Sequence, residues 1–177
     1  ASEGVAALNT GNGWVGSLTA FEGGNGYYLV ATSDFEFSFN GKSDGIVRHP
    51  LPIRATPQEY SFTQSDMQAF YFVKSATISG ESLEEDDIII AYNNDVIVGS
   101  RYWNGEFTDV PAMGVISMSD YFPEVADMTA GYCESGDSIT FKVLDASTGN
   151  LVSMNAYGDI LWSGMRISII VLEESTQ

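Results

Sequence analysis

Short apolar runs separated by polar turns recur along the whole chain. Runs of roughly four to eight residues that are rich in Val, Ile, Phe and Tyr and bounded by Gly, Asn, Asp or Ser are typical of β-strands. Nine such runs predict strands at residues 14–21, 26–32, 35–40, 59–63, 68–78, 87–93, 96–103, 138–146 and 166–175. Because they are regularly spaced with turn residues between them, we predict an all-β fold, an antiparallel β-sandwich or jelly-roll-like arrangement.

The polar positions within these runs indicate which strand faces meet the core. In residues 35–39, "FEFSF", the three phenylalanines share one face, and Glu36 and Ser38 share the other. The three isoleucines at 88–90 leave no polar position, so we expect that strand to be covered on both faces. The "NND" at 93–95 tolerates left-handed backbone and predicts a tight hairpin to the next strand.

Helical periodicity is weak. Residues 65–70, "SDMQAF", could form a short helical turn with Ser65 as its N-cap. Residues 117–128 are a second candidate, but Pro123 would interrupt a long helix there. We therefore expect short helical turns at most.

A connector divides the predicted strands into two groups. Residues 41–58 carry three of the five prolines and three of the seven basic residues, a composition typical of an extended linker. We predict a small N-terminal β unit at 1–47 and a β-sandwich domain at 48–177. The first residues, "ASEGVAALNTGNG", lack an initiator methionine and the features of an intact signal peptide. We expect that the N-terminus was processed or that the sequence begins inside a longer protein.

The charge balance narrows the class of partner. The chain has 24 acidic and 7 basic residues, a formal net charge of −17. This charge repels phosphate backbones, so we expect no nucleic-acid binding, and it suits cations such as calcium. A polar surface with only three lysines is common in exported proteins and favours an extracellular location. No apolar run approaches the roughly 18 residues of a membrane span, so no membrane insertion is expected.

Catalytic signatures are missing from the sequence. No G-x-S-x-G, phosphate-binding loop or H-E-x-x-H motif occurs, and the "GGNG" at 23–26 is a turn. The single cysteine, Cys133, cannot form an internal disulfide, and nothing in the spacing pairs it with the single histidine, His49. We therefore predict that the protein is not an enzyme.

The acidic cluster at 84–87 has three interpretations. As a solvated loop, it would keep an apolar strand soluble. As a calcium site, it would use carboxylate oxygens, with further ligands from the loop at 120–127. As a catalytic site, it would need a carboxylate spacing that adjacent acids do not specify. The candidate calcium ligands are Glu84, Glu85, Asp86 and Asp87, with Asp120, Glu124 and Asp127 as additions.

Aromatic residues suggest a second kind of site, because exposed rings stack on sugars. The alternative for each ring, and the more frequent one, is packing in the core or at its rim. The segment "RYWNGEF" is the strongest candidate, because two aromatic residues precede a polar turn. Its proposed glycan-binding residues are Arg101, Tyr102, Trp103 and Glu106.

Two long segments resemble a known module. Residues 69–114 and 129–154 are similar to a β-rich repeat module of large secreted and surface proteins of aquatic bacteria and of structural proteins of their phages. The matching positions are Gly80, Leu83, Asp87, Ala91, Tyr92, Val98, Gly99, Trp103, Pro111, Met113, Gly114, Gly131, Tyr132, Gly136, Asp137 and 140–149. Residues 13–30 resemble the closing half of a smaller β unit that often precedes the module.

The resemblance implies an architectural or adhesive role and carries no catalytic signature. We expect a non-enzymatic component of an extracellular or virion surface assembly, of the decoration, fibre or surface-layer type. Its partners would be other protein subunits, either copies of itself or parts of a larger assembly. The missing first half of the small unit would leave strand edges that invite such pairing. The alternative is a carbohydrate-binding module, for which calcium is a candidate stabilising ion.

Overall fold

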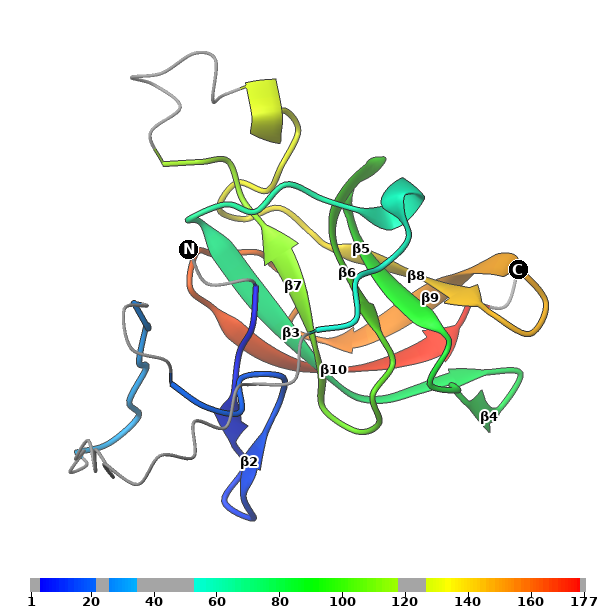
Figure 1. Cartoon of the computed structure of the whole chain (residues 1–177), viewed down its shortest axis with the longest axis horizontal. Helices are drawn as coiled ribbons and strands as arrows, with labels where there is room; N and C mark the ends of the chain where they lie inside the picture. The colour runs from blue at the N-terminus through cyan, green and yellow to red at the C-terminus, as the bar shows by residue number, and fades with distance from the viewer. Residues whose placement is uncertain (1–3, 22–25, 35–52, 118–126, 176–177) are drawn as a thin grey trace, which may run out of the picture.

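The computed structural model describes residues 4–21, 26–34, 53–117 and 127–175 (Figure 1). These residues contain two 3-10 helices, η1 (Gln58–Tyr60) and η2 (Asp127–Thr129), and no α-helix. The strands are β1 (Leu8–Asn9), β2 (Trp14–Val15), β3 (Gln68–Ile78), β4 (Glu81–Ser82), β5 (Ile88–Asn93), β6 (Val96–Tyr102), β7 (Thr108–Met113), β8 (Thr140–Asp145), β9 (Asn150–Gly158) and β10 (Ile167–Glu174). The predicted all-β, sandwich-like fold is confirmed.

Eight of the strands form one curled sheet. Its order is β4-β3-β10-β9-β8-β5-β6, and β7 pairs with β3 next to β4. All of these ladders are antiparallel except one, because β10 runs parallel to β3. The expectation of a purely antiparallel arrangement is therefore wrong at this pair, where β10 returns to lie beside the first strand of the sheet.

Strand β5 is buried along its whole length. Ile89 and Ala91 join the main core, whereas Ile88, Ile90 and Tyr92 form a second cluster on the opposite face. The prediction of cover on both faces is confirmed. The hairpin prediction is confirmed as well, since Asn93 pairs with Val96 and Asn94 turns the chain with a φ of 52°.

Strands β6 and β7 close the curl by direct packing. A Cβ added at Gly99 of β6 would lie 1.7 Å from the carbonyl oxygen of Pro111 on β7, so the two backbones touch. Tyr71 and Phe141 fill the interior with an edge-to-face ring contact at 5.4 Å between centroids. We call the contact line of β6 and β7 the seam.

Several sequence predictions differ from the structure. Residues 26–32 and 61–63 form no strand, and 58–60 form η1. The predicted helical turn at 65–70 is an N–H···Oγ turn from Met67 to Ser65 (3.0 Å), after which β3 begins at once. Strands β7 and β9 were not predicted. The predicted strand at 35–40 and most of the helix candidate at 117–128 lie outside the described residues.

The first described residues pack on the outside of the sheet. Residues 4–18, which we call the N-terminal arm, contain the β1–β2 hairpin. Leu8 and Val15 of the arm pack in one cluster with Phe70 and Phe72 of β3. The division into units 1–47 and 48–177 stays a prediction, but the arm itself shares a buried cluster with the body.

Candidate functional site

A buried ion pair lies where the N-terminal arm meets the seam. Arg101 is on β6 and Asp109 is on β7, and both side chains are almost fully buried. The Nε–H of Arg101 donates to the backbone carbonyl of Asp109 (3.0 Å), and its terminal nitrogen lies 3.7 Å from the Asp109 carboxylate. The Arg101 side chain therefore bridges two strands that share no ladder.

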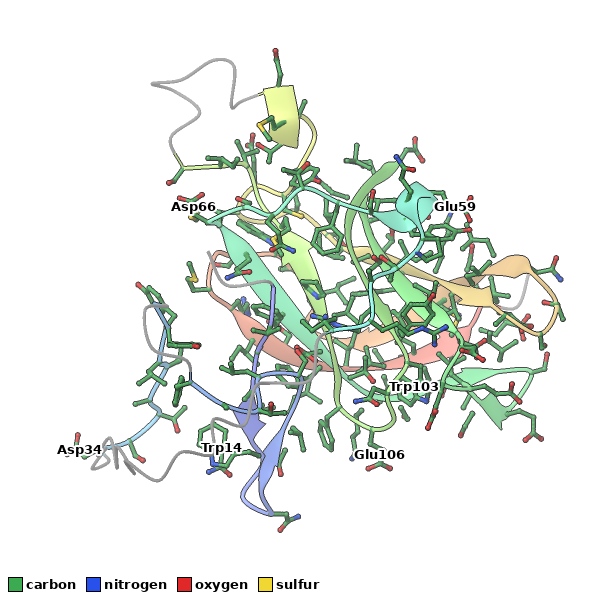
Figure 2. The ribbon with its side chains drawn as sticks, viewed as in Figure 1. Trp14, Asp34, Glu59, Asp66, Trp103 and Glu106 are labelled. Atoms are coloured by element: carbon green, nitrogen blue, oxygen red, sulfur yellow. The ribbon has the colours of Figure 1, made fainter. Side chains whose placement is uncertain are left out.

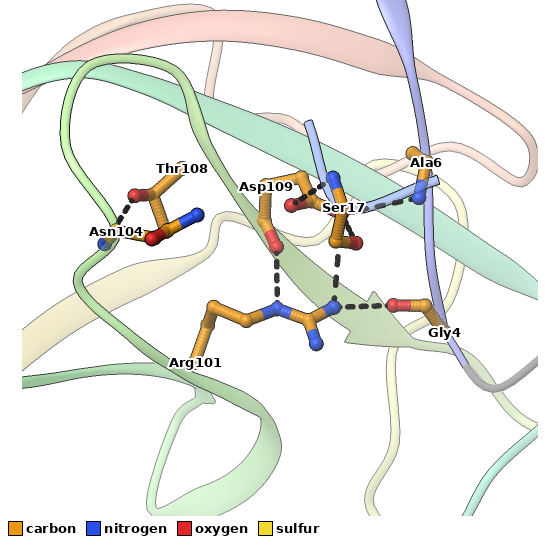
Figure 3. Close-up of polar contacts among 7 residues, drawn as sticks. All are labelled: Gly4, Ala6, Ser17, Arg101, Asn104, Thr108 and Asp109. Atoms are coloured by element: carbon orange, nitrogen blue, oxygen red, sulfur yellow. Dashed lines mark hydrogen bonds and ion pairs between the residues drawn. The ribbon is translucent and has the colours of Figure 1, made fainter. Parts of the chain in front are cut away.

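The same pair binds the arm (Figure 3). The Asp109 carboxylate accepts hydrogen bonds from the backbone N–H groups of Ala6 (3.1 Å) and Ser17 (2.9 Å) and from the Ser17 hydroxyl. Arg101 donates to the carbonyl of Gly4. Arg101 and Asp109 of the body thus bind the arm on both sides of its hairpin, at Gly4 and Ala6 before β1 and at Ser17 after β2. We call these five residues the arm anchor.

Burial and the partner's charge shift the pKa values of Arg101 and Asp109 in opposite directions. Burial raises the pKa of Asp109, while the Arg101 charge and the donors from the arm act to lower it. Burial likewise lowers the pKa of Arg101, and the Asp109 charge opposes this. Each charge would be costly to bury alone, so each depends on the other.

The predicted glycan-binding residues do not gather on one exposed face. Trp103 is 8% exposed and belongs to the main core, and Arg101 is part of the arm anchor. Tyr102 is half-buried, with the Arg54 guanidinium 3.6 Å above its ring. Glu106 is exposed in the β6–β7 connection, at the lower side of the molecule in the view of Figure 2. Only Tyr102 and Glu106 of this set offer surface to a ligand, and glycan binding stays a prediction.

The acidic cluster does lie in the loop before β5, as predicted. Asp87 is buried, and its carboxylate accepts the backbone N–H groups of Glu84 (2.8 Å) and Ala146 (2.9 Å). Asp86 pairs with Arg54 at 2.7 Å on the surface, and Glu84 and Glu85 are exposed. Asp87 thus fixes the loop that leads into β5.

Other acids of the resemblance motifs also fix turns. Asp145 accepts the hydroxyls of Ser147 (2.7 Å) and Thr148 (2.8 Å), which lowers its pKa. Asp137 accepts the amide of Asn93 (2.9 Å) and the backbone N–H of Glu134 (2.8 Å). These carboxylates satisfy backbone and side-chain donors in loops, which is a structural use of acidic residues.

The described residues contain no group of three or more His, Cys, Asp or Glu side chains arranged to hold a metal ion. Of the additional calcium candidates, Asp120 and Glu124 lie outside the described residues, and Asp127 is exposed in η2. The calcium hypothesis stays a prediction. Among the helices that the structure describes, none has the length and apolar character needed to cross a membrane.

Comparison with known proteins gives no family and no structural relative for this chain. No protein-family model, curated protein or solved structure matches it. The resemblance to the β-rich module therefore stays a prediction, and function has to be argued from the chain's own geometry.

Sequence reasoning singled out Arg101 but assigned it to the surface, and it missed Asp109 and Ser17. The available signal was a charged residue inside each of two apolar strands, "VGSRYW" and "TDVPAM", which requires a buried partner. No signal in the sequence pairs these residues with Gly4, Ala6 or Ser17.

The Cys133 thiol is expected to be inert in the folded protein. It is 1% exposed, and burial, assisted by the charge of Asp137, raises its pKa to about 12. Because the thiolate is the reactive form, a disulfide reagent at pH 8 should react only as fast as the chain opens. One equivalent of thiol should appear at once in guanidinium chloride, which serves as the control. Rapid stoichiometric reaction of the native protein would contradict the burial.

Proposed function

We propose that the protein is a non-enzymatic structural or adhesive component of an extracellular or virion surface assembly. Its contacts would be made with other copies of the chain or with other protein subunits. The observation that carries this proposal is the amount of apolar surface left exposed on a strongly acidic chain.

Large apolar side chains are exposed in several places. Contiguous exposed apolar surface marks interaction sites in soluble proteins, whereas scattered single residues do not. The exposed side chains fall mainly in β2, in residues 28–30 and in strands β9 and β10. The largest exposed fractions are Tyr28 77%, Trp14 71%, Val30 65%, Met128 57%, Tyr157 54%, Leu161 51%, Leu29 50% and Ile169 48%.

The rest of the molecule supports a role as a rigid part. Strand β5 is covered on both faces, the seam packs backbone against backbone, and acids brace the turns. Of the three buried charged residues that the structure describes, Arg101 and Asp109 form the arm anchor, which attaches the N-terminal arm to the body, and Asp87 fixes the loop before β5. A rigid body with apolar contact areas is well suited to building an assembly.

Light scattering of the native protein, with and without EDTA, tests this proposal. We expect a particle heavier than the single 19.2 kDa chain. If EDTA dissociates the particle, a bound divalent cation such as calcium stabilises the contact between subunits, and residues 84–87 become the first candidate ligands to substitute. If EDTA has no effect, the assembly holds without calcium. A monomer at every concentration would contradict the proposal.

A further inference from the structure

The outer face of strands β9 and β10 carries an uncovered apolar stripe. Along β10, Ser168, Ile170 and Leu172 point into the core, so the alternate residues point outward. Tyr157 of β9 lies opposite Val171 in the antiparallel ladder. The outward residues that make up the stripe are Ile167, Ile169 and Val171 of β10 and Tyr157 of β9.

The neighbouring sectors of the same outer face are covered. On one side, Phe70 and Phe72 of β3 lie under the N-terminal arm. On the other side, Ile88 and Ile90 of β5 pack with Tyr60 of η1. The sheet order places β10 and β9 between these two sectors. Within the part of the chain that the structure describes, the stripe is therefore an uncovered interval between two covered sectors.

A second uncovered apolar segment lies elsewhere in the chain. Tyr28, Leu29 and Val30 are exposed in a stretch that forms no strand. Residues 26–33 contain no charged side chain, although the chain as a whole carries −17. In Figure 1 this light-blue segment lies at the left edge, beyond the N-terminal arm. The segment does not cover the stripe of its own chain, because Ile169 and Tyr157 stay exposed.

The two surfaces match each other in chemistry. The four stripe residues and residues 26–33 carry no charged side chain, and Glu173 ends the stripe on the same outward face of β10. The missing charge matters because two copies of so acidic a chain repel each other at most other surfaces. An extended segment can lay alternate side chains on a sheet face. The stripe offers Ile, Val and Tyr side chains, and the segment offers Tyr, Leu and Val.

We propose that residues 28–30 of one copy pack on the β9–β10 stripe of a second copy. This inference rests on the proposed assembly role and names the surfaces that make the contact. The contact joins two different surfaces, so it is heterologous, and repeating it builds a ring or an open filament. Each copy then completes the cover of its neighbour's sheet.

A complementation experiment tests this pairing. Leu29→Glu disables the segment and leaves the stripe, and Ile169→Glu disables the stripe and leaves the segment. Each variant alone should need at least about tenfold more protein to assemble, because a charge enters an apolar contact. An equimolar mixture should form a discrete dimer of twice the 19.2 kDa chain mass. The intact segment of the Ile169→Glu chain binds the intact stripe of the Leu29→Glu chain, and the two substituted surfaces cannot extend the assembly.

Met128→Glu is the matched control, because Met128 is also an exposed apolar residue but lies in η2. It should assemble like the unchanged protein. Both substitutions of the test lie at exposed positions, and circular dichroism checks that each variant is folded. As a second readout, copies with Leu29→Cys and copies with Ile169→Cys should form a mixed disulfide in preference to either symmetric one. The buried Cys133 does not compete.

The outcomes separate this inference from the proposed function. If the unchanged protein assembles and both glutamate variants assemble equally well, the inference fails while the assembly role stands. If each variant is monomeric and the mixture stays monomeric, the segment-to-stripe pairing is overturned. If the unchanged protein is a monomer throughout, both proposals fail. A mixed dimer together with the mixed disulfide supports the pairing.

Discussion

Replacing Asp109 by alanine should lower the free energy of unfolding by about 3–5 kcal/mol, because it leaves the buried Arg101 without its counter-charge. The same substitution removes the acceptor for the N–H groups of Ala6 and Ser17 and for the Ser17 hydroxyl. We therefore expect the N-terminal arm to detach. Denaturant unfolding measures the stability, and hydrogen exchange at residues 4–18 measures the arm.

Asp86→Ala is the matched control for this prediction. It also removes an aspartate paired with an arginine, but the Arg54–Asp86 pair is exposed, so stability should change little. A double-mutant cycle with Arg101→Met should show strong coupling between positions 101 and 109. The arm anchor does not hold the arm if two results are found together. The Asp109→Ala protein would unfold at the same denaturant concentration as the unchanged protein, and residues 4–18 would exchange their amide hydrogens equally slowly in both.

Replacing Gly99 by alanine should destabilise the protein by at least about 3 kcal/mol or prevent folding. The added Cβ would stand 1.7 Å from the carbonyl oxygen of Pro111. Because this oxygen belongs to the backbone of β7, no side-chain rotation can relieve the clash. The seam could accommodate it only by separating β6 from β7, which would also disturb the Arg101 bridge. Thermal unfolding and the yield of soluble protein measure this effect.

Gly26→Ala gives the comparison for the seam. A Cβ at Gly26 meets no atom within 4 Å, so the same chemical change should leave the unfolding temperature nearly unaltered. Equal stability of the Gly99→Ala and Gly26→Ala proteins would show that the seam is looser than the structure has it.

Strands with a strong apolar pattern were predictable from the sequence. The predictions for 68–78, 87–93, 96–103 and 166–175 match β3, β5, β6 and β10 closely, because Val, Ile, Phe and Tyr dominate them. Strand β7 escaped prediction because Asp109 and Pro111 interrupt its pattern. That proline is tolerated because β7 pairs only with β3. Strand β9 mixes Ser153, Asn155 and small residues, since half of it faces outward.

The arm anchor could not be predicted, for a different reason. Arg101 and Asp109 are near each other in the sequence, but their partners Gly4, Ala6 and Ser17 lie about ninety or more positions away. Such contacts depend on how the whole chain folds, and local propensity carries no information about them. The β-forming residues of 26–32 predict a strand, but the structure forms none there. No strand among the described residues pairs with this segment.

The parallel pairing of β3 with β10 has a consequence for how the chain folds. Phe70 and Ile167 are neighbours in this ladder, although most of the sheet lies between them in the sequence. Loop-closure entropy has to be overcome before such a distant pair is stabilised, so we expect slow folding relative to proteins rich in local contacts. During synthesis, β3 must wait for β10 to leave the ribosome. Until then the apolar residues of β3 lack the cover that β10 gives them, and exposed apolar surface makes an incomplete chain prone to aggregation.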